Sequence, residues 1–382
     1  MQVKHQQRLA LSICFFISGL SFSTWASRIP SVKELFDLNE AQLGSLLLVL
    51  PIGNIVGLPI SGWLVSKFDS RNPLLAGIIL IAISLAGIGW STNIYTLIVC
   101  LFFYAFSVRI MNIAMNTQSI SVQQSFLRKI IGSFHAAWSC GGIAGVAVST
   151  VMVRYNIGMG IHLSIVGFSI LVLIGIFFRF LLKGDKAVKG AKLKLGKPNG
   201  YIFILGILAF FASICEGGMF DWSGVYFKDV VKEEIFTLGY LTFMVFMALS
   251  RFFSDFIIEK IGMKKNYIIS SCMVVLGVII VVVFPYFWPA LIGFSIVGLG
   301  VASVMPMTIG LAGKSPKYSA GMAVSIVTTY NVTGMLLGPA IIGYLGELIG
   351  LRFAFLIFLI AGLMLMPISR QFFKRQSANI SD

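Results

Sequence analysis

Long apolar segments, separated by short polar ones, run along the whole chain. A helix needs about 20 apolar residues to cross the hydrocarbon core of a bilayer. Twelve segments reach about that length, and most contain glycine or proline, which membrane helices tolerate. They are 9–28, 42–65, 73–91, 94–120, 132–154, 159–182, 201–226, 237–258, 266–285, 288–311, 320–345 and 351–373. The pattern therefore predicts an all-α membrane protein with twelve transmembrane helices.

Composition agrees with this prediction and excludes other classes. Hydrophobic residues make up 58% of the chain and charged residues only 11%, against about 25% charged residues in soluble domains. The five cysteines lie in separate apolar segments, without the spacing of a disulfide framework or a metal site. Walker A, His-Glu-x-x-His and Gly-x-Ser-x-Gly motifs are absent. We expect no enzyme activity, no catalytic residues, no cofactor and no metal.

The basic residues are distributed asymmetrically between the two sides of this layout. With the N-terminus in the cytoplasm, 21 of the 29 Lys and Arg residues fall on the cytoplasmic side and 6 on the other. This asymmetry predicts that both termini are cytoplasmic, and it accounts for the net charge of +15 without a nucleic-acid partner. Lys4 and Arg8 precede the first segment as in a signal peptide, but eleven further segments predict that it is retained.

The chain also shows an internal repeat. A lysine-rich polar connection at 183–200 separates two sets of six segments. An offset of 193 residues aligns the loop after the second segment with the loop after the eighth, and Gly141 and Gly145 with Gly334 and Gly338. We expect two pseudo-symmetric six-helix bundles, 1–182 and 201–382, joined by a cytoplasmic linker at 183–200. Repeated bundles are typical of secondary transporters.

Several strings resemble the major facilitator superfamily. Residues 62–71 resemble its loop motif after helix two, with Ser66 where the motif has an acid and Asp69 where it has glycine. Residues 259–265 resemble a second copy, and 334–339 resemble its Gly-Pro helix motif. Strings similar to a MosC-like bacterial branch of the family are 24–30 (Thr-Trp-Ala-Ser-Arg-Ile-Pro), 115–118, 134–137 and 216–223.

The resemblance implies a multi-pass transporter of the bacterial inner (plasma) membrane, with helices one, four, seven and ten lining a cavity. It suggests alternating access, coupled to protons or another ion, for a small polar solute that is sugar-like, polyol-like or amine-like. We expect a monomer whose partners are the solute, the coupling ion and the lipid bilayer. Two alternatives stay open: an efflux pump for amphipathic compounds, and a membrane sensor or scaffold that transports nothing.

A charge in mid-bilayer is costly unless it faces a partner or water, so charged residues within the segments are candidate site residues. Arg109, Asn112 and Asn116 are spaced i, i+3, i+7 and share one helix face. That face suits the hydroxyls or a carboxylate of a substrate, because arginine offers a planar donor fork. The alternative is a hydrogen-bond cluster between helices.

Glu216 is the second candidate, as a proton carrier or a substrate contact. The alternative is a permanent ion pair, for which Arg109 is one candidate partner. Tyr330 and Asn331 lie near the middle of the eleventh segment and can reach a cavity or pack. His135 opens the fifth segment and, because histidine titrates near neutral pH, is a candidate proton relay or an interfacial residue.

Two pairs are candidate gates. The repeat offset maps Arg28 onto Asp221, at the outer ends of helices one and seven. Opposite charges at matched positions can pair when the outer side closes; the alternative is an arginine that reaches the headgroups and an aspartate held locally. Arg251 and Asp255 are spaced i, i+4 near the inner end of the eighth segment, as a structural pair or an inner gate.

Overall fold

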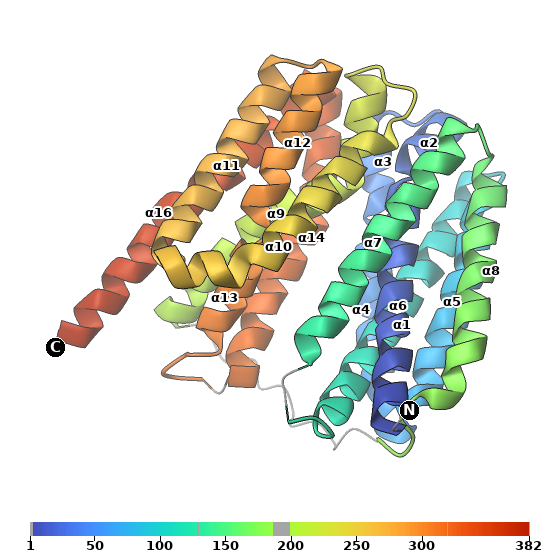
Figure 1. The fold of residues 1–382 in the computed structure, drawn as a ribbon. Coiled ribbons are helices and arrows are strands. Elements are labelled where there is room, and N and C mark those ends of the chain that lie inside the picture. Colours follow the sequence, from blue (N-terminus) through green and yellow to red (C-terminus); the bar gives the residue numbers. More distant parts are fainter. Residues whose placement is uncertain (1–2, 128–129, 186–198, 319, 382) are drawn as a thin grey trace. The chain divides into compact units, whose positions relative to one another are not determined.

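The computed structural model describes residues 3–127, 130–185, 199–318 and 320–381, and every regular element in these ranges is a helix (Figure 1). In hydrocarbon a helix satisfies its own backbone N–H and C=O groups. The elements are α1 (Val3–Ala26), α2 (Ile29–Leu35), α3 (Glu40–Leu47), α4 (Val49–Lys67), α5 (Arg71–Gly89), α6 (Ile94–Gln123), α7 (Ile131–Arg154), α8 (Met159–Phe177), the 3-10 turn η1 (Phe178–Phe180), α9 (Gly200–Asp229), α10 (Thr237–Ile261), α11 (Met263–Val283), α12 (Phe287–Val301), α13 (Val304–Ala312), α14 (Ala320–Ile349), α15 (Leu351–Ala354) and α16 (Leu356–Ser381).

The described residues form twelve helical stretches that are long and apolar enough to cross a membrane, and each overlaps one predicted segment. The predicted all-α transmembrane fold is therefore confirmed. The first stretch differs most, because it covers Val3–Leu35 rather than 9–28. There α1 ends at Ala26 and α2 continues after a short turn, with Pro30 in its first turn, where the missing N–H costs no hydrogen bond.

The chain divides into two compact units. Unit 1 comprises Met1–Asp37 and Leu46–Lys192, and unit 2 comprises Leu38–Ser45 and Leu193–Asp382. Within unit 2, most of α3 packs on α14, where the Ser45 and Tyr344 hydroxyls lie 2.9 Å apart. Residues 186–198 of the predicted linker lie outside the described residues, and the predicted bundle limits at 182 and 201 stay a prediction.

In unit 1, α7 packs closely against α1 through glycines. A Cβ added to Gly141 would overlap the carbonyl oxygen of Phe16, and one added to Gly145 would lie 2.6 Å from that of Leu20. In lipid, apolar burial alone supplies little drive for helix association, so close backbone approach at small residues holds helices together. This pair therefore depends on the two glycines of the repeat.

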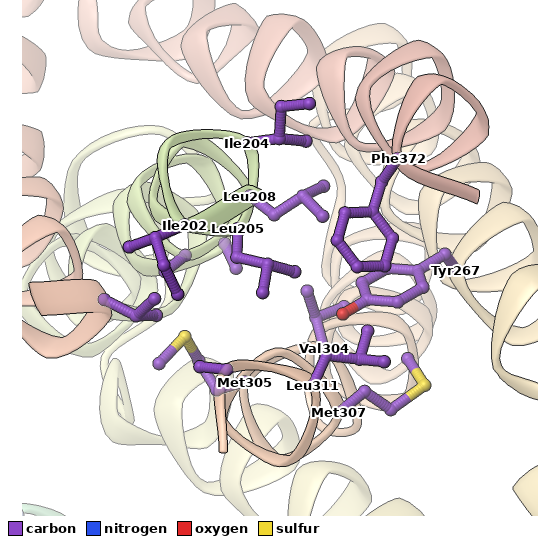
Figure 2. Packing of buried hydrophobic residues seen from close by; sticks show 14 of the residues in the cluster. Ile202, Ile204, Leu205, Leu208, Tyr267, Val304, Met305, Met307, Leu311 and Phe372 are labelled. Carbon is purple, nitrogen blue, oxygen red and sulfur yellow. The ribbon is translucent and has the colours of Figure 1, made fainter. Parts of the chain in front are cut away.

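Unit 2 repeats this contact between α14 and α9. A Cβ on Gly334 would overlap the carbonyl oxygen of Phe210, and one on Gly338 would lie 3.3 Å from the Cα of Ile214. Figure 2 shows the core beside it, where side chains from α9, α11, α13 and α16 meet. Its one labelled polar group, the Tyr267 hydroxyl, lies 2.8 Å from Thr308 Oγ1.

The loop between α4 and α5, which carries the loop motif of unit 1, is hydrogen-bonded to the segment that follows η1. Asp69 accepts a hydrogen bond from the backbone N–H of Gly184 at 2.9 Å. Asp185 in turn accepts from the N–H of Ser70 at 3.1 Å and from its hydroxyl at 2.6 Å. A carboxylate at this position also complements the N-terminus of α5. Asp69, which departs from the family motif, thus holds the segment that follows η1.

Candidate functional site

An ion pair joins α9 to α10 within unit 2. Arg251 Nη2 donates to Glu216 Oε1 at 2.6 Å, and Arg251 Nε donates to the carbonyl oxygen of Ala302 at 3.4 Å. The arginine side chain is 27% exposed and the glutamate 12%. Both side chains are therefore largely buried, and each charge is neutralised by the other. Both residues are candidates from the sequence, but their spacing did not indicate that they pair.

Asp255 was predicted to pair with Arg251 on α10. The side chain of Asp255 lies outside the described residues, so this pairing stays a prediction. The Arg251 guanidinium donates to Glu216 on α9 and to the Ala302 carbonyl oxygen at the end of α12.

A smaller polar cluster lies one turn from the ion pair. Asn331 Nδ2 donates to the Ser213 hydroxyl, and Ser213 is three residues before Glu216 on α9. Asn331 Nδ2 also lies 3.4 Å from the sulfur of Met305 on α13. The predicted candidates Glu216, Asn331 and Arg251 therefore gather around one stretch of α9. Met305 was not predicted, because nothing in the pattern distinguishes it from a packing residue.

The ring of Tyr330, the other candidate on α14, packs against residues of α9. Its ring lies against Gly206, where an added Cβ would be 2.6 Å from the ring. The ring of Phe203 stands edge-on to it at 6.3 Å between centroids. A side chain at position 206 would displace Tyr330, so these contacts fix its ring; its role in binding stays a prediction.

In unit 1, α6 carries Arg109, Asn112 and Asn116 as the spacing predicts. Asn116 is exposed and donates to the Asn112 carbonyl oxygen at 2.8 Å, which is a local helical contact. Arg109 is half-buried beside Gly57 of α4, and its Nε makes no hydrogen bond to any described residue. A buried donor without a partner is costly; the binding of a substrate by Arg109 stays a prediction.

His135 is exposed on the first turns of α7, and its ring stands edge-on to Phe15 of α1 at 5.6 Å. Its role as a proton relay stays a prediction.

Arg28 is buried in unit 1, with only 5% of its surface exposed. Its Nε donates to His162 Nδ1 at 2.9 Å, and Nη2 donates to the carbonyl oxygen of Ile157 at 2.8 Å. His162, on α8, is fully buried, and its Nε2 has no hydrogen-bond partner among the described residues. His162 is not among the site residues predicted from the sequence; a histidine inside a predicted span was the available signal. The pairing of Arg28 with Asp221, which is half-buried on α9, stays a prediction.

The repeat places different chemistry at matched positions of the two units. In unit 2 these positions hold Ser213, Glu216 and Asn331. The helix contact matches Phe16 with Phe210 and Leu20 with Ile214, so the offset is 194 between α1 and α9 and 193 between α7 and α14. By these offsets the matching unit 1 residues are Gly19, Phe22 and Trp138. Unit 2 has the hydrogen bond between Asn331 and Ser213. At the matched positions of unit 1, Gly19 lies against the Trp138 backbone, and the rings of Phe22 and Trp138 are 6.0 Å apart between centroids. The polar cluster is therefore specific to unit 2.

Comparison with protein families gives a match to the Major Facilitator Superfamily at residues 11–331 and 235–381. An uncharacterized MFS-type transporter of Yersinia pestis is 30% identical, covering 91% of each chain. The membrane protein MosC of Rhizobium meliloti is 29% identical, covering 96% of this chain and 90% of that protein. The cis,cis-muconate transport protein of Acinetobacter baylyi is 23% identical, covering 91% and 90%.

Solved structures share the fold. A bacterial homologue of the human lysosomal transporter Spinster, inward-facing and unoccupied, superposes with a TM-score of 0.79 at 15% identity, covering 98% of each chain. The nucleoside transporter NupG superposes with a TM-score of 0.73 at 15% identity, covering 98% of this chain and 99% of that one. At such identities the likeness establishes the arrangement of helices alone.

Proposed function

The chain belongs to the Major Facilitator Superfamily, and on that premise we propose that it is a secondary active transporter that moves a small polar solute by alternating access, coupled to protons. The solute class is sugar-like, polyol-like or amine-like. The observation that carries the proposal is the Glu216–Arg251 ion pair, with the Ser213–Asn331 hydrogen bond one turn away. Ionisable residues inside membrane helices mark ion and substrate pathways.

The ion pair supports coupling because its two states differ in charge. When Glu216 binds a proton, its carboxyl becomes neutral and Arg251 loses its counter-charge. An arginine whose partner is removed inside a membrane protein must find another acceptor or water. Protonation would thereby change which partner Arg251 binds, and that change can be linked to solute binding.

Arg109 supports the choice of a polar solute. Its half-buried guanidinium carries a donor with no partner among the described residues, and Asn112 and Asn116 continue the same face. Such donors fit hydroxyl or carboxylate oxygens. The relative from Acinetobacter baylyi is named for cis,cis-muconate, which makes that compound a useful member of a test panel.

The test begins with a thermal-shift screen of the purified protein against sugars, polyols, amines and muconate. A ligand at a hundred times its dissociation constant stabilises the folded state by about 2.7 kcal/mol. The solute that raises the unfolding temperature is then used in proteoliposomes. Wild-type protein is expected to accumulate it against its gradient when a proton gradient is imposed.

Glu216→Gln keeps the shape and an acceptor for Arg251 but does not exchange a proton. We expect it to abolish uphill accumulation while exchange of labelled solute at equal concentrations continues. Glu347→Gln, at an exposed glutamate near the end of α14, is the matched control and should behave as wild type. Uphill accumulation by Glu216→Gln would exclude Glu216 as the proton carrier. Loss of exchange as well would assign Glu216 to solute binding or folding instead.

We further propose that both termini face the cytoplasm of a bacterial cell. The support is the 21-to-6 distribution of basic residues between the two sides of the twelve-span layout.

A further inference from the structure

A crevice of about 200 Å³ lies in unit 2 where α10, α11 and α12 meet, apart from the ion pair and the polar cluster. Its walls are apolar and partly open to the surroundings, with Leu249 and Phe253 each 47% exposed and Ile269 45% exposed. The apolar lining residues are Leu249, Phe253, Ile257, Ile269, Met273 and Leu299. In a membrane an open apolar crevice is filled by acyl chains, because an empty one forfeits van der Waals contacts.

The floor of the crevice is polar. Its polar lining residues are Ser250, Ser254, Asn266, Ser270 and Ser303. Asn266 Nδ2 donates to Ser303 Oγ at 3.0 Å, and the hydroxyls of Ser270 and Ser303 lie 3.3 Å apart. Asn266, Ser270 and Ser303 are each at most 5% exposed, so these side chains satisfy one another and close the inner side of the crevice.

The polar floor runs inward from the ends of the two helices. Asn266 is three residues into α11, which is about 5 Å along the helix, and Ser254 is seven residues before the end of α10, which is about 10 Å. The headgroup region of a bilayer is roughly 5–7 Å deep on each side. The crevice therefore spans the boundary between headgroups and acyl chains.

The rim at that end is basic. Lys260, Lys264 and Lys265 are exposed, and Glu259 is the one acidic residue at 259–265. Lys260 is three residues after the lining residue Ile257, and Lys265 is four before Ile269, so both ammonium groups share helix faces with the crevice. Basic residues at a membrane surface attract anionic lipids.

We propose that this crevice is a binding site for an anionic phospholipid, such as phosphatidylglycerol. The phosphate pairs with Lys260 and Lys265 at the rim, and an acyl chain lies deeper, along Phe253 and Ile269. The site is independent of the transported solute. Only its assignment to the cytoplasmic leaflet rests on the proposed orientation.

The test is native mass spectrometry of the full-length protein in detergent with added phosphatidylglycerol or phosphatidylcholine of identical acyl chains. Wild type is expected to retain phosphatidylglycerol preferentially. The double variant Lys260→Gln/Lys265→Gln should lower that preference about fivefold for each lysine removed. Lys314→Gln/Lys317→Gln, which removes two exposed lysines from the loop after α13, is the matched control. Equal retention of both lipids by wild type, or an equal loss in the control, would overturn the proposal.

A second pair of variants tests the crevice itself. Ser270→Leu fills the floor and Leu249→Trp narrows the mouth from its exposed side, and both should reduce retention of phosphatidylglycerol. Ser270→Ala removes only one hydroxyl and should have a smaller effect. Unchanged retention by folded Leu249→Trp would place the lipid elsewhere and overturn the proposal. Displacement of the lipid by inorganic phosphate alone would likewise overturn it, because the acyl chain would then contribute nothing.

Discussion

The buried Arg28 guanidinium is held by acceptors from a distant part of the chain. It donates to His162 on α8 and to the Ile157 carbonyl oxygen, 129 or more residues along the chain. Because Nδ1 of His162 accepts the bond from Arg28, that nitrogen carries no proton. A sequence shows that Arg28 lies in an apolar segment, but it does not show which helix supplies the acceptor.

Removing the acceptor of Arg28 tests this contact. We expect His162→Leu to lower the free energy of unfolding by about 1–3 kcal/mol, because Arg28 Nε then lacks its partner in a buried site. His162→Asn is the control, since its side-chain oxygen can take the place of Nδ1. Thermal unfolding in detergent should rank wild type and His162→Asn above His162→Leu. An identical unfolding temperature for His162→Leu would mean that the bond contributes nothing to stability.

At the scale of helices, close packing depends on where side chains are absent. The α1–α7 contact in unit 1 and the α9–α14 contact in unit 2 both place a glycine directly against a carbonyl oxygen of the partner helix. Helix propensity alone would favour alanine at such positions by about 1 kcal/mol. Glycine occurs there despite this lower helix propensity, because the backbone of the partner helix fills the space that a Cβ would need.

Gly141→Ala should therefore destabilise unit 1, since the new methyl group overlaps the Phe16 carbonyl oxygen and α7 must move away from α1. Gly175→Ala in α8 is the control, because no atom lies within 4 Å of its added Cβ. We expect a lower folded yield by size-exclusion chromatography, and a lower unfolding temperature, for Gly141→Ala only. If both variants behave alike, the glycine contact does not limit the packing of α7.

For the molecule as a whole, hydropathy predicted the spans well because bilayer thickness sets their length and no partner is needed to form them. Span ends were less accurate where a helix continues past the apolar segment, as it does after Pro30. The partners of the candidate residues were not predictable. Glu216 and Arg251 are 35 residues apart on adjacent helices, and the rotation of each helix decides whether they meet. The repeat offset aligned Arg28 with Asp221 but carried no information about His162.

The proposed orientation of the whole chain predicts the accessibility of its loops. In a variant without the five native cysteines, Lys183→Cys and Lys232→Cys place single thiols at exposed positions on opposite sides of the predicted layout. A membrane-impermeant thiol reagent added to intact cells should label position 232 and leave position 183 unlabelled until the membrane is opened. Labelling of position 183 but not 232 in intact cells would mean that the orientation is the opposite one, and labelling of both would contradict the twelve-span layout.

The doubled glycine contact also bears on how such a chain diversifies. If both units descend from one ancestral six-helix gene, positions that still match between them are those that the fold requires in either copy. Positions that no longer match, such as Gly19 against Ser213 and Trp138 against Asn331, have been free to take separate roles since the duplication. Each unit thus serves as an internal reference for the other, and the mismatched helix-contact positions form a short set at which to look for the origin of solute selectivity.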